Sequence, residues 1–298
     1  MPRIARIFQV DAFTDTQFAG NPAGVVLDAG QLSDAEMLAI ARELNNGDTA
    51  FVLPATAADH DIGVRFFTPR KEAPFVGHAT LAVHAVLARL APQPLRRQQG
   101  RTGIVEVQAL SGNAGFSIRQ PAPALGRTLA PAELEQVLAL LGLSREHLDP
   151  ACPPRIAGAA STRLLLGVHA ASALDTMQPQ LAALGALSAQ LGAQGYFVFA
   201  RSARAPGCDT EARMFCPALG IDEDPVSGNA HAMLGVYLVE HGLLTPRGSA
   251  AGFVGAQGAH VGRPGRVTVR VEVDAAGRPA AASIAGQAVV VFEASLRL

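Results

Sequence analysis

The sequence predicts an α+β fold of two similar halves, each a strongly curved mixed sheet wrapped around one apolar helix. The first observation is a repeat, because RFFTPRKEAPFVGHAT (65–80) reappears half a chain later as RMFCPALGIDEDPVSGNAH (213–231). The matched positions are Pro69 with Pro217, Glu72 with Glu223, Pro74 with Pro225, and Gly77 with Gly228. The second observation is that both copies lead into helix-forming stretches that are apolar nearly all round, which are stable only when buried. One duplication at this spacing predicts two facing domains rather than a solenoid.

Composition limits the class of protein and its partners. The chain has 298 residues with 49% hydrophobic and 16% charged residues, which predicts about two well-packed domains and argues against disorder. The formal net charge is −1 without any run of Lys or Arg, so we expect no nucleic acid and no acidic membrane as partner. Three scattered cysteines without a CxxC pair give no disulfide framework and fit a reducing, cytoplasmic compartment. No signal peptide or membrane helix is indicated.

The elements of the first half follow from periodicity and from start and stop signals. A helix should begin at Ser33, where Glu36 completes a capping box, and end before Asn45-Asn46-Gly47. Asp48 then opens a strand. The other expected elements are strands at 4–13, 23–28 and 63–69, a buried helix at 77–90, and a hairpin of 104–108 with 115–119.

The second half repeats this order. We expect strands at 163–168, 196–200 and 211–217, a helix at 178–191, a second buried helix at 228–244, and closing strands at 266–273 and 287–292. An amphipathic helix at 131–142 belongs to the connection between the halves, and the Pro-rich stretch 120–133 is the predicted linker.

The starts of the two buried helices are candidate binding sites for an anion. Gly77-His78 and Gly228-Asn229 stand there, and a helix N-terminus offers unpaired N–H groups and partial positive charge. A bound carboxylate would acidify a neighbouring C–H bond. The alternative is that both glycines only allow tight turns between strand and helix.

Three titratable residues occur in one copy of the repeat only. Asp48 matches Gln194, Asp224 matches Ala73, and His78 matches Asn229, so the backbone is repeated while the acid and base groups are not. This asymmetry predicts proton transfer by Asp48, with His78 and Asp224 assisting. The alternatives are a turn-capping Asp48, an Asp224 that stabilises the helix dipole, and a structural His78.

Other chemistry finds little support in the sequence. There is no HxxxH or HExxH spacing for a metal, no phosphate-binding glycine motif for a nucleotide, and no cysteine at either helix start. We therefore expect neither metal nor cofactor, and a thiol-based epimerase is disfavoured.

Four segments in matching order resemble the PhzF family of phenazine biosynthesis, which is similar in fold to diaminopimelate epimerase and proline racemase. They are 8–27, 32–54, 67–87 and 220–231. The resemblance implies two pseudo-symmetric domains, 1–120 and 121–286 with the connecting helix 131–142 in the second, and a last strand (about 287–298) that packs on the first. It also implies a cofactor-free active site between the domains and a homodimer.

The resemblance assigns site residues. Asp48 takes the place of the family's acid/base, which is usually Glu, while Gly77-His78 and Asp224 match its other motifs. Ser227, Gly228 and Asn229 stand where the family often has Thr-Gly-Ser, and we expect them, with Gly77, to bind substrate.

These observations predict an isomerase that moves a proton at carbon in a small carboxylic or amino-acid-like substrate. The alternatives are an amino-acid epimerase or racemase, and a non-catalytic binder of small carboxylates. The shorter Asp48 and the amide of Asn229 both indicate a substrate different from that of the phenazine enzyme. The sequence does not identify the substrate.

Overall fold

The computed structural model describes residues 4–158 and 161–298, and it divides them into two compact units. Unit 1 comprises residues 1–119 and 285–298, and unit 2 comprises 120–284. Each unit combines a mixed sheet with few helices, so the predicted α+β class is confirmed. No helix in the described residues has the length and apolar character needed to cross a membrane.

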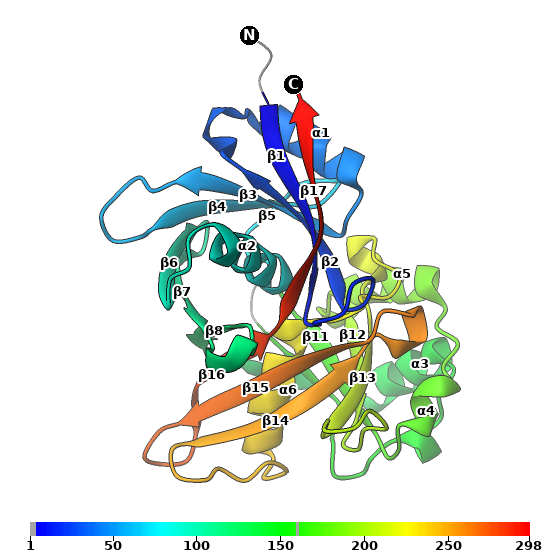
Figure 1. Ribbon diagram of the computed structural model, residues 1–298. Helices are drawn as coiled ribbons and strands as arrows, with labels where there is room; N and C mark the ends of the chain where they lie inside the picture. The colour runs from blue at the N-terminus through cyan, green and yellow to red at the C-terminus, as the bar shows by residue number, and fades with distance from the viewer. Residues whose placement is uncertain (1–3, 159–160) are drawn as a thin grey trace. The chain divides into compact units, whose positions relative to one another are not determined.

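The sheet of unit 1 curves around the predicted buried helix, α2 (Gly77–Leu90) (Figure 1). Its strands pair in the order β17 (Ala288–Arg297), β1 (Ile4–Ala12), β2 (Asn21–Leu27), β3 (Asp48–Pro54), β4 (Ile62–Phe67), β6 (Leu95–Gly100), β7 (Gly103–Ala109) and β8 (Phe116–Pro121). The short β5 (Glu72–Ala73) adds to β4. The pairs β2–β3 and β4–β6 are parallel and the others antiparallel. Helix α2 packs on β1, β2, β3 and β17, and all of Ala79–Val86 is buried there.

Helix α1 (Asp34–Leu44) covers the other face of the same sheet. Its apolar residues Met37, Ile40 and Ala41 join a core cluster with Phe51 and Phe67. The predicted capping box is present, because Ser33 Oγ accepts from the Glu36 amide at 3.3 Å while the Glu36 carboxylate accepts from the Ser33 amide at 2.8 Å. The sheet therefore has an α2 face and an α1 face.

Unit 2 repeats this pairing pattern. Going from each strand to its neighbour, the pairs are antiparallel or parallel in the same sequence as for β17, β1, β2, β3, β4, β6 and β7 of unit 1. The strands of unit 2 in this order are β9 (Leu125–Thr128), β10 (Arg155–Ala157), β11 (Arg163–Val168), β12 (Tyr196–Ala200), β13 (Thr210–Phe215), β14 (Ala250–Gln257) and β15 (Gly265–Val273). The last strand is β16 (Pro279–Gly286). Helix α6 (Gly228–Glu240) packs on β9, β14 and β15. The outer helices are α3 (Pro131–Leu141), α4 (Ser172–Asp175) and α5 (Leu181–Leu191), and their apolar residues share a core cluster with β11 and β12.

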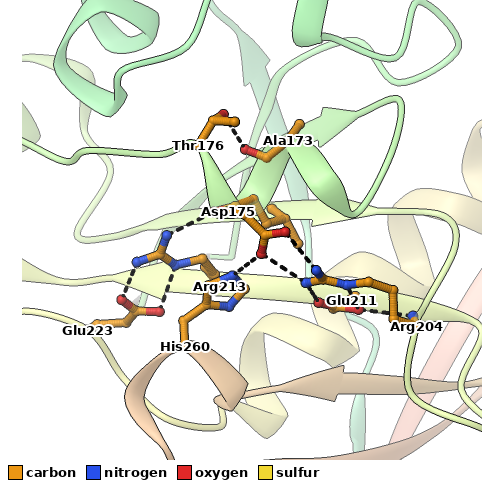
Figure 2. Close-up of polar contacts among 9 residues, drawn as sticks. Ala173, Asp175, Thr176, Arg204, Glu211, Arg213, Glu223 and His260 are labelled. Carbon is orange, nitrogen blue, oxygen red and sulfur yellow. Dashed lines mark hydrogen bonds and ion pairs between the residues drawn. The ribbon is translucent and has the colours of Figure 1, made fainter.

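The duplication extends to one pair of side chains. In unit 1 the Arg65 guanidinium donates to both oxygens of Glu72 at 2.8 and 3.0 Å, and in unit 2 Arg213 does the same to Glu223 at 2.9 and 2.7 Å (Figure 2). Each guanidinium also lies over the phenylalanine two residues later, 5.1 and 5.0 Å from the ring centre. The matched glutamates therefore serve the same structural purpose in both copies.

Several predicted boundaries were wrong. The helix expected at 228–244 ends at Glu240, where Gly242 adopts a left-handed φ of 68°, and the helix expected at 178–191 begins only at Leu181. The predicted linker 120–133 contains strand β9 and the start of α3. Strands β6, β14 and β16 were missed because they are polar or rich in Ala and Gly and lack a clear apolar alternation.

Candidate active site

In unit 1 the fold brings Asp48 and His78 together. Asp48 is the first residue of β3 and lies beside Ala23 of β2, whose side chain belongs to the core on the α2 face. Its carboxylate therefore points toward α2, and its Oδ2 lies 3.8 Å from Nε2 of His78, the second residue of that helix. Only 12% of either side chain is exposed. This arrangement joins a strand start and a helix start into one polar site.

The His78 imidazole is neutral near pH 7, because burial lowers its pKa to about 4. The contact with Asp48 is therefore not an ion pair, and 3.8 Å is too long for a hydrogen bond. Within the described residues, the buried His78 Nε2 atom has no hydrogen-bond partner. A buried polar atom without a partner costs free energy and requires an explanation, and a ligand that bonds to it supplies one.

A buried polar chain holds the start of α2. The Thr80 hydroxyl donates to the carbonyl of Val76, the N-cap residue, at 2.9 Å. The Gln98 amide of β6 donates to Thr80 Oγ1 at 3.4 Å, and His84 Nε2 lies 3.2 Å from Gln98 Oε1. Val76 itself offers no side-chain cap. These hydrogen bonds of buried side chains fix the start of α2, while the first turn of the helix remains suited to bind an anion.

In unit 2 the start of α6 is also fixed, mainly by Gln257. Its side chain accepts from the Ser227 amide at 3.1 Å and donates to the Asp224 carbonyl at 2.6 Å, so it spans the segment before the helix. Ser227 is the N-cap, and its Oγ accepts from the Ala230 amide at 3.3 Å. His231 Nδ1 donates to the Ser227 carbonyl at 2.8 Å. Three buried side chains therefore determine where Gly228 and Asn229 lie.

Glu223 and Asp224 differ in what they can do. Glu223 is bound by both arms of Arg213, which also donates to the Leu174 carbonyl at 2.9 Å (Figure 2). That carboxylate is committed to structure. Asp224 is half-buried, and its amide donates to the Met214 carbonyl at 2.9 Å, so its backbone is fixed next to the start of α6. Asp224 is the better candidate of the two for chemistry.

The predicted site residues thus form two groups. Asp48, Gly77 and His78 meet in unit 1, while Asp224, Ser227, Gly228 and Asn229 meet in unit 2. Sequence reasoning missed the buried residues that hold the two helix starts, namely Gln98, His231 and Gln257. Their only sequence signal was a polar residue within or beside an apolar run. Among residues 4–158 and 161–298, no three His, Cys, Asp or Glu side chains come together as ligands for a metal.

Known proteins of one family resemble this chain over its whole length. The family model described as "Phenazine biosynthesis-like protein" (PhzC-PhzF) matches residues 10–294. An uncharacterized isomerase of Clostridium acetobutylicum is 37% identical over 303 residues, which cover all of both chains. The trans-2,3-dihydro-3-hydroxyanthranilate isomerase of Pseudomonas aeruginosa is 31% identical over 90% of each chain.

Solved structures show the same fold. A PhzF-family protein of Bacillus anthracis superimposes with a TM-score of 0.89 at 27% identity, over 99% of this chain and 100% of that one. A hydroxyproline epimerase of Agrobacterium vitis, solved with trans-4-hydroxy-L-proline, has a TM-score of 0.63 at 14% identity, over 99% and 93% of the two chains. The second likeness concerns the fold alone.

Proposed function

We propose that this chain, which belongs to the phenazine biosynthesis-like (PhzC-PhzF) family and is an isomerase, moves a proton between atoms of a small carboxylic or amino-acid-like substrate without a cofactor. The observation that carries the proposal is the Asp48 carboxylate 3.8 Å from a buried, neutral His78 whose Nε2 atom has no protein partner in the described residues.

In the proposed reaction Asp48 is the general base and then the general acid. It takes a proton from a substrate carbon and returns it to another carbon on the same face, which requires no net change in the protein. The neutral His78 contributes a hydrogen bond at Nε2 rather than a positive charge, and it stabilises charge that develops on a substrate oxygen or nitrogen.

A helix start in each unit is proposed to bind a carboxylate. The first turn of α2 at Gly77 in unit 1 and the first turn of α6 at Gly228 in unit 2 are each suited to bind a substrate carboxylate, because helix N-termini attract anions. Asp224 and Asn229 would contact the polar end of a substrate, with Ser227 as the N-cap that orients them. A carboxylate held this way acidifies the adjacent C–H bond and lowers the barrier for Asp48.

The substrate class follows from the chemistry of these groups. A carboxylate at the helix starts and an exchangeable C–H near Asp48 describe a small unsaturated or hydroxylated amino acid. The Pseudomonas relative is named for such a compound, trans-2,3-dihydro-3-hydroxyanthranilate. Asp48 is one methylene shorter than glutamate and Asn229 carries an amide, so we propose a related substrate of different shape rather than that compound.

Solvent deuterium uptake tests the proposal even when the product is unidentified. The protein is incubated in D₂O with a panel of unsaturated and hydroxylated amino acids that includes trans-2,3-dihydro-3-hydroxyanthranilate, and mass spectrometry follows each compound. We expect one member to gain deuterium, and Asp48→Asn to lower the rate at least about 10²-fold with unchanged folding. The matched control is Asp28→Asn, because Asp28 is exposed in a left-handed conformation (φ 56°) that asparagine adopts readily. Full exchange by Asp48→Asn would remove this residue from the mechanism.

Amino-acid epimerisation is the second candidate. Inversion requires proton donors on opposite faces of one carbon, and unit 1 supplies a single carboxylate beside a neutral imidazole. The same assay distinguishes the two, because an epimerase incorporates deuterium at the carbon whose configuration inverts. The test compound is trans-4-hydroxy-L-proline, which the Agrobacterium epimerase binds. Inversion of this compound would favour the epimerase.

We further propose a cytoplasmic homodimer. All three cysteines are free thiols, and two of them are buried, which fits a reducing compartment. Light scattering behind a sizing column measures the molar mass, and a mass of one chain at micromolar concentration would contradict the dimer.

A further inference from the structure

The turn that delivers Asp48 is tied to the sheet by a reciprocal pair of amide hydrogen bonds. Gln9 Nε2 donates to Asn46 Oδ1 at 3.0 Å, and Asn46 Nδ2 donates to Gln9 Oε1 at 2.8 Å. Gln9 lies in the middle of β1, and Asn46 stands two residues before Asp48. We propose that Gln9 and Asn46 are positioning residues that set the place of the Asp48 carboxylate, an inference that rests on the proposed role of Asp48.

The two faces of the sheet explain how this pair acts on Asp48. Gln9 pairs with Gly24 of β2 and Gly24 with Thr49 of β3, so these residues point to the α1 face. Ala23 and Asp48 are the next pair and point to the α2 face, where His78 lies. The Gln9–Asn46 hydrogen bonds therefore hold the chain on the α1 face of the sheet, just before β3 begins. The side chain of Asp48, the first residue of β3, projects from the opposite face, the α2 face.

The rest of the turn offers few other restraints. Asn45, the C-cap of α1, is exposed in a left-handed conformation (φ 52°), and Gly47 is exposed with open space where a Cβ would be. Asn46 is the half-buried member of the three. Without the hydrogen bonds to Gln9, the three residues 45–47 between the end of α1 and Asp48 would lose this side-chain restraint.

Asp48 needs such a restraint because its reach is short. An aspartate has only one χ angle before its carboxyl group, so a shift of its Cα passes almost undiminished to the oxygens. A displacement of about 1 Å at a reacting group can lower a rate about 10²-fold. Close packing against Gly24 is a second restraint. A Cβ there would lie 2.9 Å from Thr49 Oγ1 and 2.8 Å from Leu44 Cδ1, so only glycine lets these two side chains pack so closely on β2.

The experiment compares Gln9→Ala, Asn46→Ala and the exchanged pair Gln9→Asn with Asn46→Gln. The exchanged pair keeps both amides and the same total number of methylene groups, so it can restore the reciprocal hydrogen bonds. Gln17→Ala is the matched control, because Gln17 also bonds from a loop of unit 1 to a strand, at 3.3 Å to the Val290 carbonyl.

Two readouts are measured on each full-length variant. The first is the NMR titration of the His78 ring nitrogens, which is sensitive to the surroundings of the ring, including the place of the Asp48 carboxyl group 3.8 Å away, and needs no substrate. The second is deuterium uptake by trans-2,3-dihydro-3-hydroxyanthranilate, or by whichever panel compound the unmodified protein exchanges faster. We expect both alanine variants to shift the His78 midpoint by several tenths of a pH unit and to lower kcat about tenfold or more, with KM within about twofold. The exchanged pair should recover most of both, and Gln17→Ala should change neither.

A purely structural pair would give a different result. Melting temperature would then fall in the alanine variants while the His78 titration and kcat stayed as in the unmodified protein, and this outcome overturns the inference. Failure of the proposed function is seen separately, because it appears as undiminished exchange in Asp48→Asn. A failure of the exchanged pair to recover the His78 midpoint would also count against the inference.

Discussion

Gly255 of β14 should not tolerate even alanine, because His231 occupies the space where a Cβ would lie. A Cβ at position 255 would lie 2.2 Å from His231 Cδ2, 2.4 Å from Nε2 and 3.0 Å from Thr210 Oγ1. His231 is fully buried on α6 and donates from Nδ1 to the Ser227 carbonyl. To reach an ordinary contact distance the ring must move by about 1 Å or more, and this breaks that hydrogen bond.

The cost can be worked out from these contacts. Over-packing of a core by one methyl group costs about 1–3 kcal/mol, and loss of a buried hydrogen bond adds about 1 kcal/mol. We therefore expect Gly255→Ala to lower the free energy of unfolding by about 3 kcal/mol, which is a fall of roughly 6–12 °C in melting temperature for a unit of this size. Urea unfolding followed by far-UV circular dichroism measures the first quantity, and calorimetry measures the second.

Unit 1 indicates how the loss can be relieved. At the equivalent place it has the short Thr80 on the helix and the long Gln98 on the strand, since Ile62 pairs with Gln98 as Thr210 pairs with Gly255. The double variant Gly255→Ala with His231→Thr should therefore be more stable than the sum of the single losses predicts, by about 2 kcal/mol. A coupling below about 0.5 kcal/mol, or a Gly255→Ala variant as stable as the unmodified protein, would refute the reasoning.

Three other substitutions or conditions give expected outcomes. Burial lowers the pKa of His78, His84 and His231 to about 4, whereas histidine in the unfolded chain has a pKa near 6.5, so the unfolded chain binds more protons as the pH falls below 6.5. The free energy of unfolding in urea should therefore be lower at pH 5 than at pH 7 by about 2 kcal/mol per histidine. Equal stability at the two pH values would contradict this expectation. Gly185→Ala in α5 should stabilise by about 0.5–1 kcal/mol, since the new methyl group meets its nearest atoms at 3.6 Å and a lower melting temperature would count against this. Ser33→Ala removes the cap of α1 and should cost about 1 kcal/mol in chemical denaturation, and no loss would show that the cap is dispensable.

Features that depend on local pattern were predicted best from the sequence. Both buried helices begin at the predicted glycines, and the strands at 163–168 and 196–200 have the predicted ends, because an apolar period and a clear break define them. The repeat aligned Glu72 with Glu223, and in the structure each of these glutamates accepts hydrogen bonds from an arginine. No sequence pattern indicated that Arg65 and Arg213 are these partners.

What the sequence could not show depends on contacts between distant segments. Gln98 and Gln257 lie in strands that the sequence pattern did not predict, and only the fold reveals that both are buried and hold the two helix starts. The approach of Asp48 to His78 likewise depends on the register of β2 with β3 and on the place of α2 above them. The roles proposed for the site residues stay predictions until the variants are measured.

The pairing of the first strand with the last has a consequence for biosynthesis. Residues 4–12 of β1 pair with two antiparallel neighbours, and one of them is formed by residues 288–297 of β17, which are synthesised more than 270 residues after β1. Unit 2 comes from one continuous stretch of chain, whereas unit 1 cannot complete its sheet until residues 288–297 have been synthesised. Until that moment the apolar side of the nascent N-terminal half lacks its last strand, so a stalled or truncated chain would present this half to chaperones and proteases.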